Sequence, residues 1–284
     1  MESNRSAATT PGATLSQLLA WARAQGVAEL DAQLLLAHAL GRPRSHLFGF
    51  GEEPCPDPAR ARYADWIARR SRGEPLAYLT GEREFWSLPL RVTQDVLVPR
   101  PETELLVERA LALGPAGTAE VLDLGTGSGA IALALATERP AWRLTASDAA
   151  DAALAVAAAN AATLGIRNCQ FVSGSWYAPI AGRRYALIVA NPPYIARGDA
   201  ALDDPALRHE PRAALVSPPD GLAALREIIA GAPAHLVSGG ALALEHGHDQ
   251  ADAVATLLRA AGFRDVTLHR DLAGLPRVSE GRTP

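Results

Sequence analysis

The first part of the chain carries apolar residues at helical spacing, which predicts a small bundle of helices. Thr14 and Gln17 form a capping box ahead of a leucine- and alanine-rich segment, so we expect a helix to begin at Leu15. A second helix is predicted over Glu29 to Leu40. A third is predicted from Asp57 to Arg72, because a proline stands in its first turn and a glycine follows its end.

The pattern changes between Pro75 and Val98. Apolar and aromatic residues are interleaved there with glycine and proline, and no long helical period continues. This pattern is typical of extended chain, and it predicts a hairpin-bearing linker.

From Glu104 onward, helical segments alternate with short apolar runs that read as strands. The strand-like segments are Val121 to Leu124, Arg143 to Ala146, Cys169 to Val172, Ala186 to Ala190, Ala241 to Glu245 and Phe263 to His269. This alternation predicts an α/β domain that contains a mostly parallel sheet with helices on both faces.

A glycine-rich turn follows the first of these strands and precedes a helix. It consists of Gly125, Thr126, Gly127, Ser128 and Gly129. Glycines let the backbone turn sharply and approach a ligand closely, and the start of the helix offers amide donors. The glycine spacing differs from that of a pyrophosphate cradle, and Asp123 precedes the turn. We therefore expect a nucleoside-like ligand that bears an ammonium group.

Two further residues extend this candidate ligand site. Asp148 stands at the end of the second predicted strand, where an acidic side chain can accept hydrogen bonds from both ribose hydroxyls. Trp176 follows the third strand, and its ring is equally suited to stacking on an adenine and to packing in the core.

The tetrapeptide Asn191-Pro192-Pro193-Tyr194 ends the fourth strand. Proline lacks the amide donor that a sheet ladder needs, so the strand delivers Asn191 to the edge of the sheet. The side-chain carbonyl of Asn191 and the backbone carbonyl of Pro192 can accept the two N–H groups of a flat amide or exocyclic amine. Tyr194 can pack over that group. Such a clamp fits methyl transfer from a sulfonium, and it suits a protein amide as well as a nucleobase.

Composition limits the remaining possibilities. The chain has 284 residues and a net charge of -4, and its cationic residues are spread among acidic ones, so no basic face for nucleic acid is expected. Cys55 and Cys169 lack the spacing of a disulfide framework or a zinc site, and the cluster from Glu245 to His248 lacks a third well-spaced metal ligand. The chain carries no hydrophobic membrane span, and residues 1–10 read as a frayed tail, so we expect a cytoplasmic protein.

Several motifs together resemble one family. Besides the glycine turn, Asp148 and the tetrapeptide, these are Gly73 to Gly81, Glu84-Phe85-Trp86, Val98 to Glu104 and Leu244 to Gly247. The chain from about Leu15 to Val278 is similar to the release factor glutamine methyltransferase family (PrmC/HemK), which is S-adenosylmethionine-dependent.

This resemblance implies N5-methylation of the glutamine in the Gly-Gly-Gln tripeptide of bacterial class 1 peptide chain release factors. It implies a helical substrate-recognition domain (1–74), a hairpin linker (75–98) and a Rossmann-like class I methyltransferase domain (99–284). The cofactor would be bound by the glycine turn, Asp148, Trp176 and Asn191, and the substrate amide by the tetrapeptide. Asn191, Pro192 and Tyr194 would be catalytic, and the segment from Arg100 to Glu104 would lie near the methionine end.

The sequence departs from the family at three places. Asp148 lacks the serine that often follows it, Ser175 stands where an aspartate is common, and we expect the divergent residues Ser279 to Pro284 to be disordered. Three alternatives stay open. They are a ribosomal-protein glutamine methyltransferase, an adenine-N6 methyltransferase, which would need a flipped base and a basic channel, and a catalytically silent cofactor-binding module.

Overall fold

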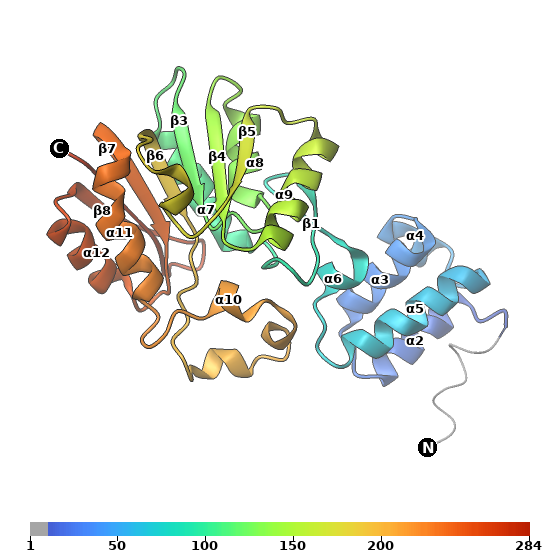
Figure 1. The fold of residues 1–284 in the computed structure, drawn as a ribbon. Coiled ribbons are helices and arrows are strands. Elements are labelled where there is room, and N and C mark those ends of the chain that lie inside the picture. Colours follow the sequence, from blue (N-terminus) through green and yellow to red (C-terminus); the bar gives the residue numbers. More distant parts are fainter. Residues whose placement is uncertain (1–10) are drawn as a thin grey trace. The chain divides into compact units, whose positions relative to one another are not determined.

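The computed structural model describes residues 11–284 (Figure 1). The tail expected over residues 1–10 lies outside the described residues. The chain forms two compact units. The smaller contains the chain up to Gly81 together with Pro205–His209, and the larger contains Glu82–Asp204 and Glu210–Pro284. This division differs from the domain boundaries expected from the sequence, and those boundaries stay a prediction.

The smaller unit is helical, as predicted. Its helices are α2 (Leu15–Ala24), α3 (Glu29–Leu40), α4 (Arg44–Gly49), α5 (Asp57–Arg70) and α6 (Leu76–Thr80). The capping box of α2 is present, since Thr14 and Gln17 each accept a hydrogen bond from the other's backbone amide. Leu35, Tyr63 and Ile67 are fully buried in its core. The prediction of extended chain from Pro75 was wrong over α6, a short helix that Pro75 opens and a left-handed Gly81 closes.

A hairpin opens the larger unit. Its strands are β1 (Glu82–Phe85) and β2 (Leu88–Arg91), which pair antiparallel. Trp86 and Ser87 form the turn with φ values of 52° and 59°, a conformation that suits the twist of a two-residue hairpin but is unusual for these residues. The Trp86 backbone amide and indole donate to Glu104 and Glu138, respectively, which holds the turn in place.

A seven-stranded sheet forms the centre of the larger unit, with the strand order β5-β4-β3-β6-β7-β9-β8. The strands are β3 (Glu120–Leu124), β4 (Arg143–Asp148), β5 (Cys169–Ser173), β6 (Tyr185–Ala190), β7 (Leu236–Glu245), β8 (Arg264–Arg270) and β9 (Pro276–Arg282). The first five strands in this order pair in parallel, and β9 pairs antiparallel with both β7 and β8. The mostly parallel α/β sheet predicted from the sequence is therefore confirmed.

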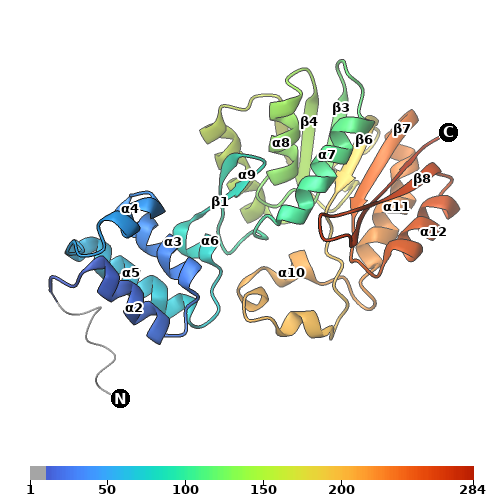
Figure 2. The same ribbon diagram turned by 180° about the vertical axis from the view of Figure 1, so that it is seen from behind.

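Helices cover both faces of this sheet (Figures 1 and 2). The helices α7 (Glu104–Leu113), α8 (Ala130–Glu138) and α9 (Asp151–Leu164) share one apolar core with alternate residues of the central strands. The helices α11 (Ala223–His235) and α12 (Ala251–Ala260) share a second core with the residues that point the other way. A central strand such as β6 is thus apolar on both faces, which explains why its sequence is a continuous apolar run.

Short elements fill the connections. They are η1 (Pro101–Thr103), η2 (Ala178–Ile180), η3 (Ala200–Asp203), η4 (Leu207–His209) and α10 (Arg212–Leu215). The last three lie in the long connection between β6 and α11. In residues 11–284 we find no helix of the length and apolar character needed to cross a membrane.

The prediction of disorder for Ser279 to Pro284 was wrong. Most of this segment belongs to β9, which lies between β7 and β8, and Ser279 and Glu280 are buried there. The strand was missed because its residues are mainly polar. Its backbone is paired on both sides, and Glu280 forms an ion pair with Arg109 and lies 3.1 Å from the His269 ring.

Candidate functional site

Four neighbouring parallel strands end at the same level of the sheet. Leu124 at the end of β3 pairs with Ser147 of β4 and with Ala190 of β6, and Ala190 pairs with Leu244 of β7. The next residues along these strands are Asp148, Gly125, Asn191 and Glu245. The chain continues from β3 to β4 on one side and returns to β6 on the other, which is the switch point where ligands bind in such sheets.

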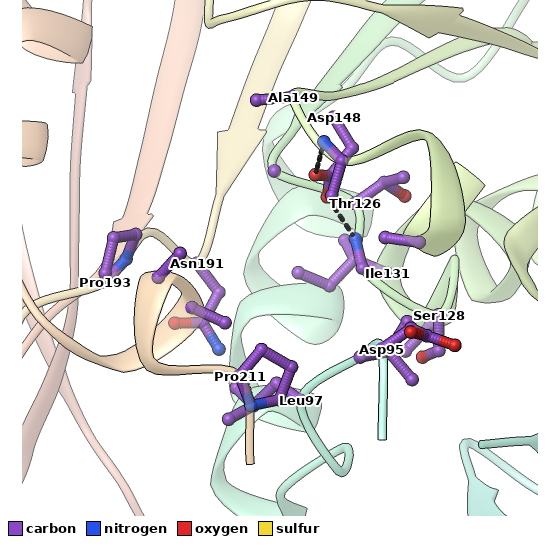
Figure 3. Close-up of a pocket in the computed structure, with 18 of the residues that line it drawn as sticks. Asp95, Leu97, Thr126, Ser128, Ile131, Asp148, Ala149, Asn191, Pro193 and Pro211 are labelled. Carbon is purple, nitrogen blue, oxygen red and sulfur yellow. Dashed lines mark hydrogen bonds between the residues drawn. The ribbon is translucent and has the colours of Figure 1, made fainter. Parts of the chain in front are cut away.

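A cavity of about 390 Å³ opens at this edge, a size within the range of small-molecule sites. Its lining includes the whole glycine turn except Gly129, together with Asp148, Trp176, Asn191 and Pro193. Figure 3 shows Asn191 and Pro193 on one side of the cavity and Asp148 and Thr126 on the other. The structure therefore brings most of the predicted site residues together.

The amides of the glycine turn are used mainly within the protein. Those of Gly125 and Thr126 donate to the Ser147 carbonyl oxygen, and that of Gly129 donates to the Thr126 carbonyl oxygen. Gly125, Gly127 and Gly129 all have positive φ values, which glycine adopts at little cost. Because these donors are already satisfied, the turn is poorly suited to cradle a pyrophosphate and can serve as a close-fitting wall.

Asp148 is fixed by backbone amides. One carboxylate oxygen accepts from Gly127 and the other from Ala150, each at 2.9 Å. Each oxygen has a further lone pair, and the residue lines the cavity, so the carboxylate can accept two hydroxyl donors.

Trp176 lies against the glycine turn. A β-carbon placed on Gly125 would come within 3.5 Å of its ring. Trp176 has a φ of 43°, a left-handed conformation that is uncommon for a bulky residue. The ring lines the cavity and also packs on the core beneath, so its two suggested roles are compatible.

Asp123 lies beneath the turn, fully buried, and is not among the residues that line the cavity. Burial raises its pKa to about 7, although a hydrogen bond from the Thr126 hydroxyl, 2.7 Å long, lowers it. Its contact with the turn is therefore structural, and the expectation of a ligand that bears an ammonium group stays a prediction.

The Asn191 side chain is held by Thr103, a buried residue of η1. The amide nitrogen of Asn191 donates to the Thr103 hydroxyl at 3.1 Å. Its amide oxygen is then the atom available to a ligand in the cavity.

Two members of the tetrapeptide do not line this cavity. Pro192 is buried, and Tyr194 packs against the core on the α11 side. The Tyr194 hydroxyl donates to Glu245 at 3.4 Å, and burial raises the pKa of this phenol well above its usual range. The roles given to Pro192 and Tyr194 stay predictions.

Sequence reasoning missed two segments of the cavity wall, residues 95–97 and 211–214. They are joined by Glu210, whose side chain is fully buried and accepts from the Val98 amide and the Arg100 guanidinium. The motif from Val98 to Glu104 was a signal for the first segment. Nothing in the sequence marked the second, because the residues that line the cavity there, Pro211, Ala213 and Ala214, are small and apolar.

The site contains no evident metal centre. In the described chain, residues 11–284, no three or more His, Cys, Asp or Glu side chains are grouped to hold an ion. His246 is buried, and its ring nitrogens lie 2.8 Å from the Gly247 carbonyl and the Ser279 hydroxyl.

Known protein families match both parts of the chain. Residues 15–81 match the PrmC N-terminal domain, and residues 101–206 match the methyltransferase small domain. A solved methyltransferase from Pyrococcus furiosus superimposes with a TM-score of 0.54 at 18% identity, covering 77% of this chain and 98% of that one. This likeness concerns the fold alone.

Curated relatives are similar over nearly the whole length. The release factor glutamine methyltransferase of Burkholderia pseudomallei is 52% identical, covering 96% of this chain and 97% of the relative. The release factor glutamine methyltransferase of Pseudomonas aeruginosa is 51% identical, covering 90% of this chain and 92% of the relative. With the glycine turn, Asp148 and Asn191 gathered at one sheet edge, the chain belongs to the release factor glutamine methyltransferase family.

Proposed function

We propose that this protein transfers a methyl group from S-adenosyl-L-methionine to the side-chain amide nitrogen of the glutamine in the Gly-Gly-Gln tripeptide of bacterial class 1 release factors. The observation that carries the proposal is the placement of Asn191 beside the glycine turn, with its amide nitrogen engaged by Thr103. The functions named for the relatives support the choice of substrate.

The cavity residues fit S-adenosyl-L-methionine. Asp148 is a fixed acceptor for ribose hydroxyls, and the Trp176 ring offers a flat apolar surface for adenine. The occupied amides of the turn favour a nucleoside over a pyrophosphate. When bound, this cofactor supplies an electrophilic methyl group on a cationic sulfur.

The substrate amide would be held by two carbonyl oxygens. A planar amide nitrogen is a weak nucleophile because its lone pair is delocalised. If Asn191 Oδ1 and the Pro192 carbonyl oxygen accept its two N–H groups, the nitrogen is fixed and its electron density is directed into the cavity. Tyr194 would border the substrate next to this pair.

The reaction then needs no strong base at the outset. With the cofactor bound, the substrate nitrogen held by Asn191 and Pro192 would bond to the methyl carbon as the carbon–sulfur bond breaks, and the positive charge would pass from sulfur to nitrogen. One N–H proton is lost afterwards, which leaves a neutral N-methyl amide. The protein's contribution is orientation and hydrogen-bond acceptance, which together are worth several orders of magnitude in rate in well-formed sites.

We also propose that residues 1–74 recognise the release factor, that 75–98 act as a linker and that 99–284 carry the chemistry. The match of residues 15–81 to a separate family domain supports an independent role for the N-terminal part.

The proposed function is tested with methyl-labelled cofactor and a purified release factor. We expect label on the wild-type release factor and none on a variant in which the glutamine of its Gly-Gly-Gln tripeptide is alanine. Purified ribosomal proteins and DNA serve as competing substrates. Label that persists in the alanine variant, or that reaches only ribosomal protein or nucleic acid, would contradict the proposal.

A further inference from the structure

One wall of the cavity is formed by irregular chain. Residues 92–100, here called the strap, connect β2 to η1 without forming a helix or a strand. Asp95 and Leu97 of the strap line the same cavity as Ser128 of the glycine turn and Pro211 (Figure 3). An irregular segment has no ladder or helix bonds to fix it, so the contacts that hold it decide how well the cavity is formed before a ligand binds.

Asn160 ties the start of the strap to the glycine turn. This residue of α9 is 2% exposed and does not line the cavity. Its amide oxygen accepts from the Arg91 N–H at 2.7 Å, and its amide nitrogen donates to the Arg91 carbonyl oxygen at 3.0 Å. The same nitrogen donates to the Ser128 carbonyl oxygen at 2.9 Å. Both N–H groups of the side chain are thus used to join the residue before the strap to the turn.

Glu210 ties the end of the strap to another part of the wall. It also lies outside the cavity lining, and its side chain is fully buried. One carboxylate oxygen accepts from the Val98 N–H at 3.0 Å, and the other accepts from the Arg100 guanidinium. Because Pro211 follows Glu210 directly and lines the cavity, these bonds join the strap to the segment 211–214.

The two side chains therefore hold the strap at both ends. Val92, Val96 and Val98 are buried and give the strap apolar contacts as well. Apolar contacts are not directional, whereas hydrogen bonds have a narrow geometry. The exact position of the strap thus depends on the bonds made by Asn160 and Glu210.

A strap that is held in place in the empty protein favours ligand binding. Ordering a loose segment costs about 1–2 kcal/mol per residue in backbone entropy, and binding would have to supply this free energy. A preorganised wall avoids that cost. A bound ligand itself orders the strap, so the two side chains should affect binding more than the chemical step.

We propose that Asn160 and Glu210 are positioning residues that hold the strap and thereby set the affinity of the protein for S-adenosyl-L-methionine. Neither residue lines the cavity, so both act through residues that do. This inference rests on the proposed use of the cavity for that cofactor, and it is independent of the identity of the methyl acceptor.

The main test compares Asn160→Ala and Glu210→Ala with the wild type. Each substitution frees one end of the strap. We expect the Kd for S-adenosyl-L-methionine, measured by calorimetry, to rise about 10-fold, the cost of ordering about one further residue on binding. The KM for the cofactor should rise with the Kd, and kcat at saturating cofactor should stay close to that of the wild type.

Glu210→Gln provides a graded variant. Its side-chain oxygen can still accept from the Val98 N–H, but its NH2 group would face the Arg100 guanidinium, donor against donor. The Kd should lie between those of the wild type and Glu210→Ala. Because the side chain keeps its size, this variant decides the question if an alanine variant fails to fold.

Hydrogen exchange without cofactor reports on the strap itself. The Val98 N–H should exchange faster in Glu210→Ala, and the Arg91 N–H should exchange faster in Asn160→Ala, while β3 keeps its protection. Saturating S-adenosyl-L-methionine should restore slow exchange at both amides. A general loss of stability would instead speed up exchange in β3 as well.

Asn168 provides the matched control for Asn160. Its amide nitrogen also donates to backbone carbonyl oxygens, those of Ala136, Arg139 and Trp142. It directly precedes β5, so it lies at the amino end of that strand, whereas the cavity lies at the carboxyl ends. Asn168→Ala should lower the melting temperature and leave the cofactor Kd unchanged.

Glu280→Ala is the control for Glu210→Ala. Glu280 is likewise buried and accepts hydrogen bonds from an arginine, Arg109, but it belongs to β9 and does not line the cavity. Its loss should also lower the melting temperature without changing the cofactor Kd.

Wild-type affinity in both Asn160→Ala and Glu210→Ala would overturn the inference, as would equal losses of affinity in the two controls. A fall in kcat at saturating cofactor with an unchanged Kd would overturn it too, because the residues would then act on the chemical step. A failure of the proposed function would look different. In that case the wild-type protein would bind the cofactor and would not label the release factor.

Discussion

Asn191 combines one occupied donor with one open acceptor. Its amide nitrogen is bound to Thr103, and the residue lines the cavity beside the glycine turn. Asn191→Ala removes the acceptor while the cofactor walls formed by Asp148 and Trp176 remain. We expect kcat to fall about 100- to 1,000-fold, the loss typical of a deleted oxyanion-hole or positioning group.

The corresponding measurement pairs methyl transfer with cofactor binding on the same preparation. Cofactor affinity of Asn191→Ala should weaken only modestly, because Asn191 is one of many lining residues. Retained transfer would refute the role assigned to Asn191, and a complete loss of cofactor binding would show that it acts mainly as a cofactor ligand.

Asp123 makes stability depend on pH. Its pKa is raised from an ordinary value of 3.8 to about 7 in the folded protein. The folded state therefore holds a proton that the unfolded state releases, and the free energy of unfolding should fall as the pH rises from 4 to 7.

Asp123→Asn tests this dependence without changing the side-chain shape. The variant should lose the part of the pH dependence of the unfolding free energy that Asp123 contributes. For one group this dependence is at most about 1.4 kcal/mol per pH unit. The pKa of Glu245 is also raised to about 7, so the free energy of unfolding of the variant should still fall with rising pH. Urea unfolding at several pH values measures both, and an unchanged slope in the variant would argue against the buried, protonated Asp123.

At the scale of elements, the glycine turn is constrained by the helices behind it. A β-carbon on Gly129 would lie 3.0 Å from Leu133 Cδ1 and 3.2 Å from the Ala157 β-carbon, and its φ is 85°. Gly165, which ends α9, has a φ of 69° and nothing within 4 Å of such a carbon. An alanine at either position would have to adopt a left-handed backbone conformation, but only at Gly129 would its β-carbon be crowded.

Alanine substitutions at these glycines should therefore differ in effect. Gly165→Ala should lower the free energy of unfolding by about 1–2 kcal/mol, the cost of a left-handed conformation. Gly129→Ala should lose about 1–3 kcal/mol more, because the extra methyl group overpacks α8 against α9. Chemical denaturation gives both values. Equal losses would mean that the helices move apart at little cost.

The predictability of each element depended on how much apolar surface it buries. The run that became β6 was found because a strand covered on both faces is almost wholly apolar. The first half of β7 was missed, since Ser238, Gly239 and Gly240 break the apolar pattern. The polar strand β9 was missed for the reason that no local pattern encodes pairing with distant strands.

Local sequence patterns also revealed only part of the candidate functional site. The glycine turn, Asp148 and Asn191 carry local signals, because each follows a strand and is chemically distinctive. Glu245 also ended a predicted strand, but only the register between β6 and β7 places it next to Asn191. The hydrogen bond between Asn191 and Thr103 likewise joins residues that are far apart in the sequence, which periodicity cannot reveal.

At the scale of the whole molecule, Pro205–His209 packs within the smaller unit although it lies between β6 and α10 in sequence. Pro205 lies directly against Gly73, and a His209 ring nitrogen lies 3.5 Å from the Arg72 carbonyl oxygen. Opening of the smaller unit should therefore expose the amides of this segment before those of β3.

Hydrogen exchange can test this with Leu35→Ala, a substitution in the core of the smaller unit that should cost about 2–5 kcal/mol. Exchange should speed up in the helices of that unit and in residues 205–209 together, while β3 keeps its protection. If residues 205–209 instead exchanged at the wild-type rate, their packing with the smaller unit would not govern their exposure.

The smaller unit is built from two separate segments of the chain, which limits how the protein can be divided into fragments. The backbone passes between the two units at residues 81/82, 204/205 and 209/210. No single scission can release the smaller unit whole, and a gene fragment that encodes only residues 1–81 would lack a piece of the unit's own packing.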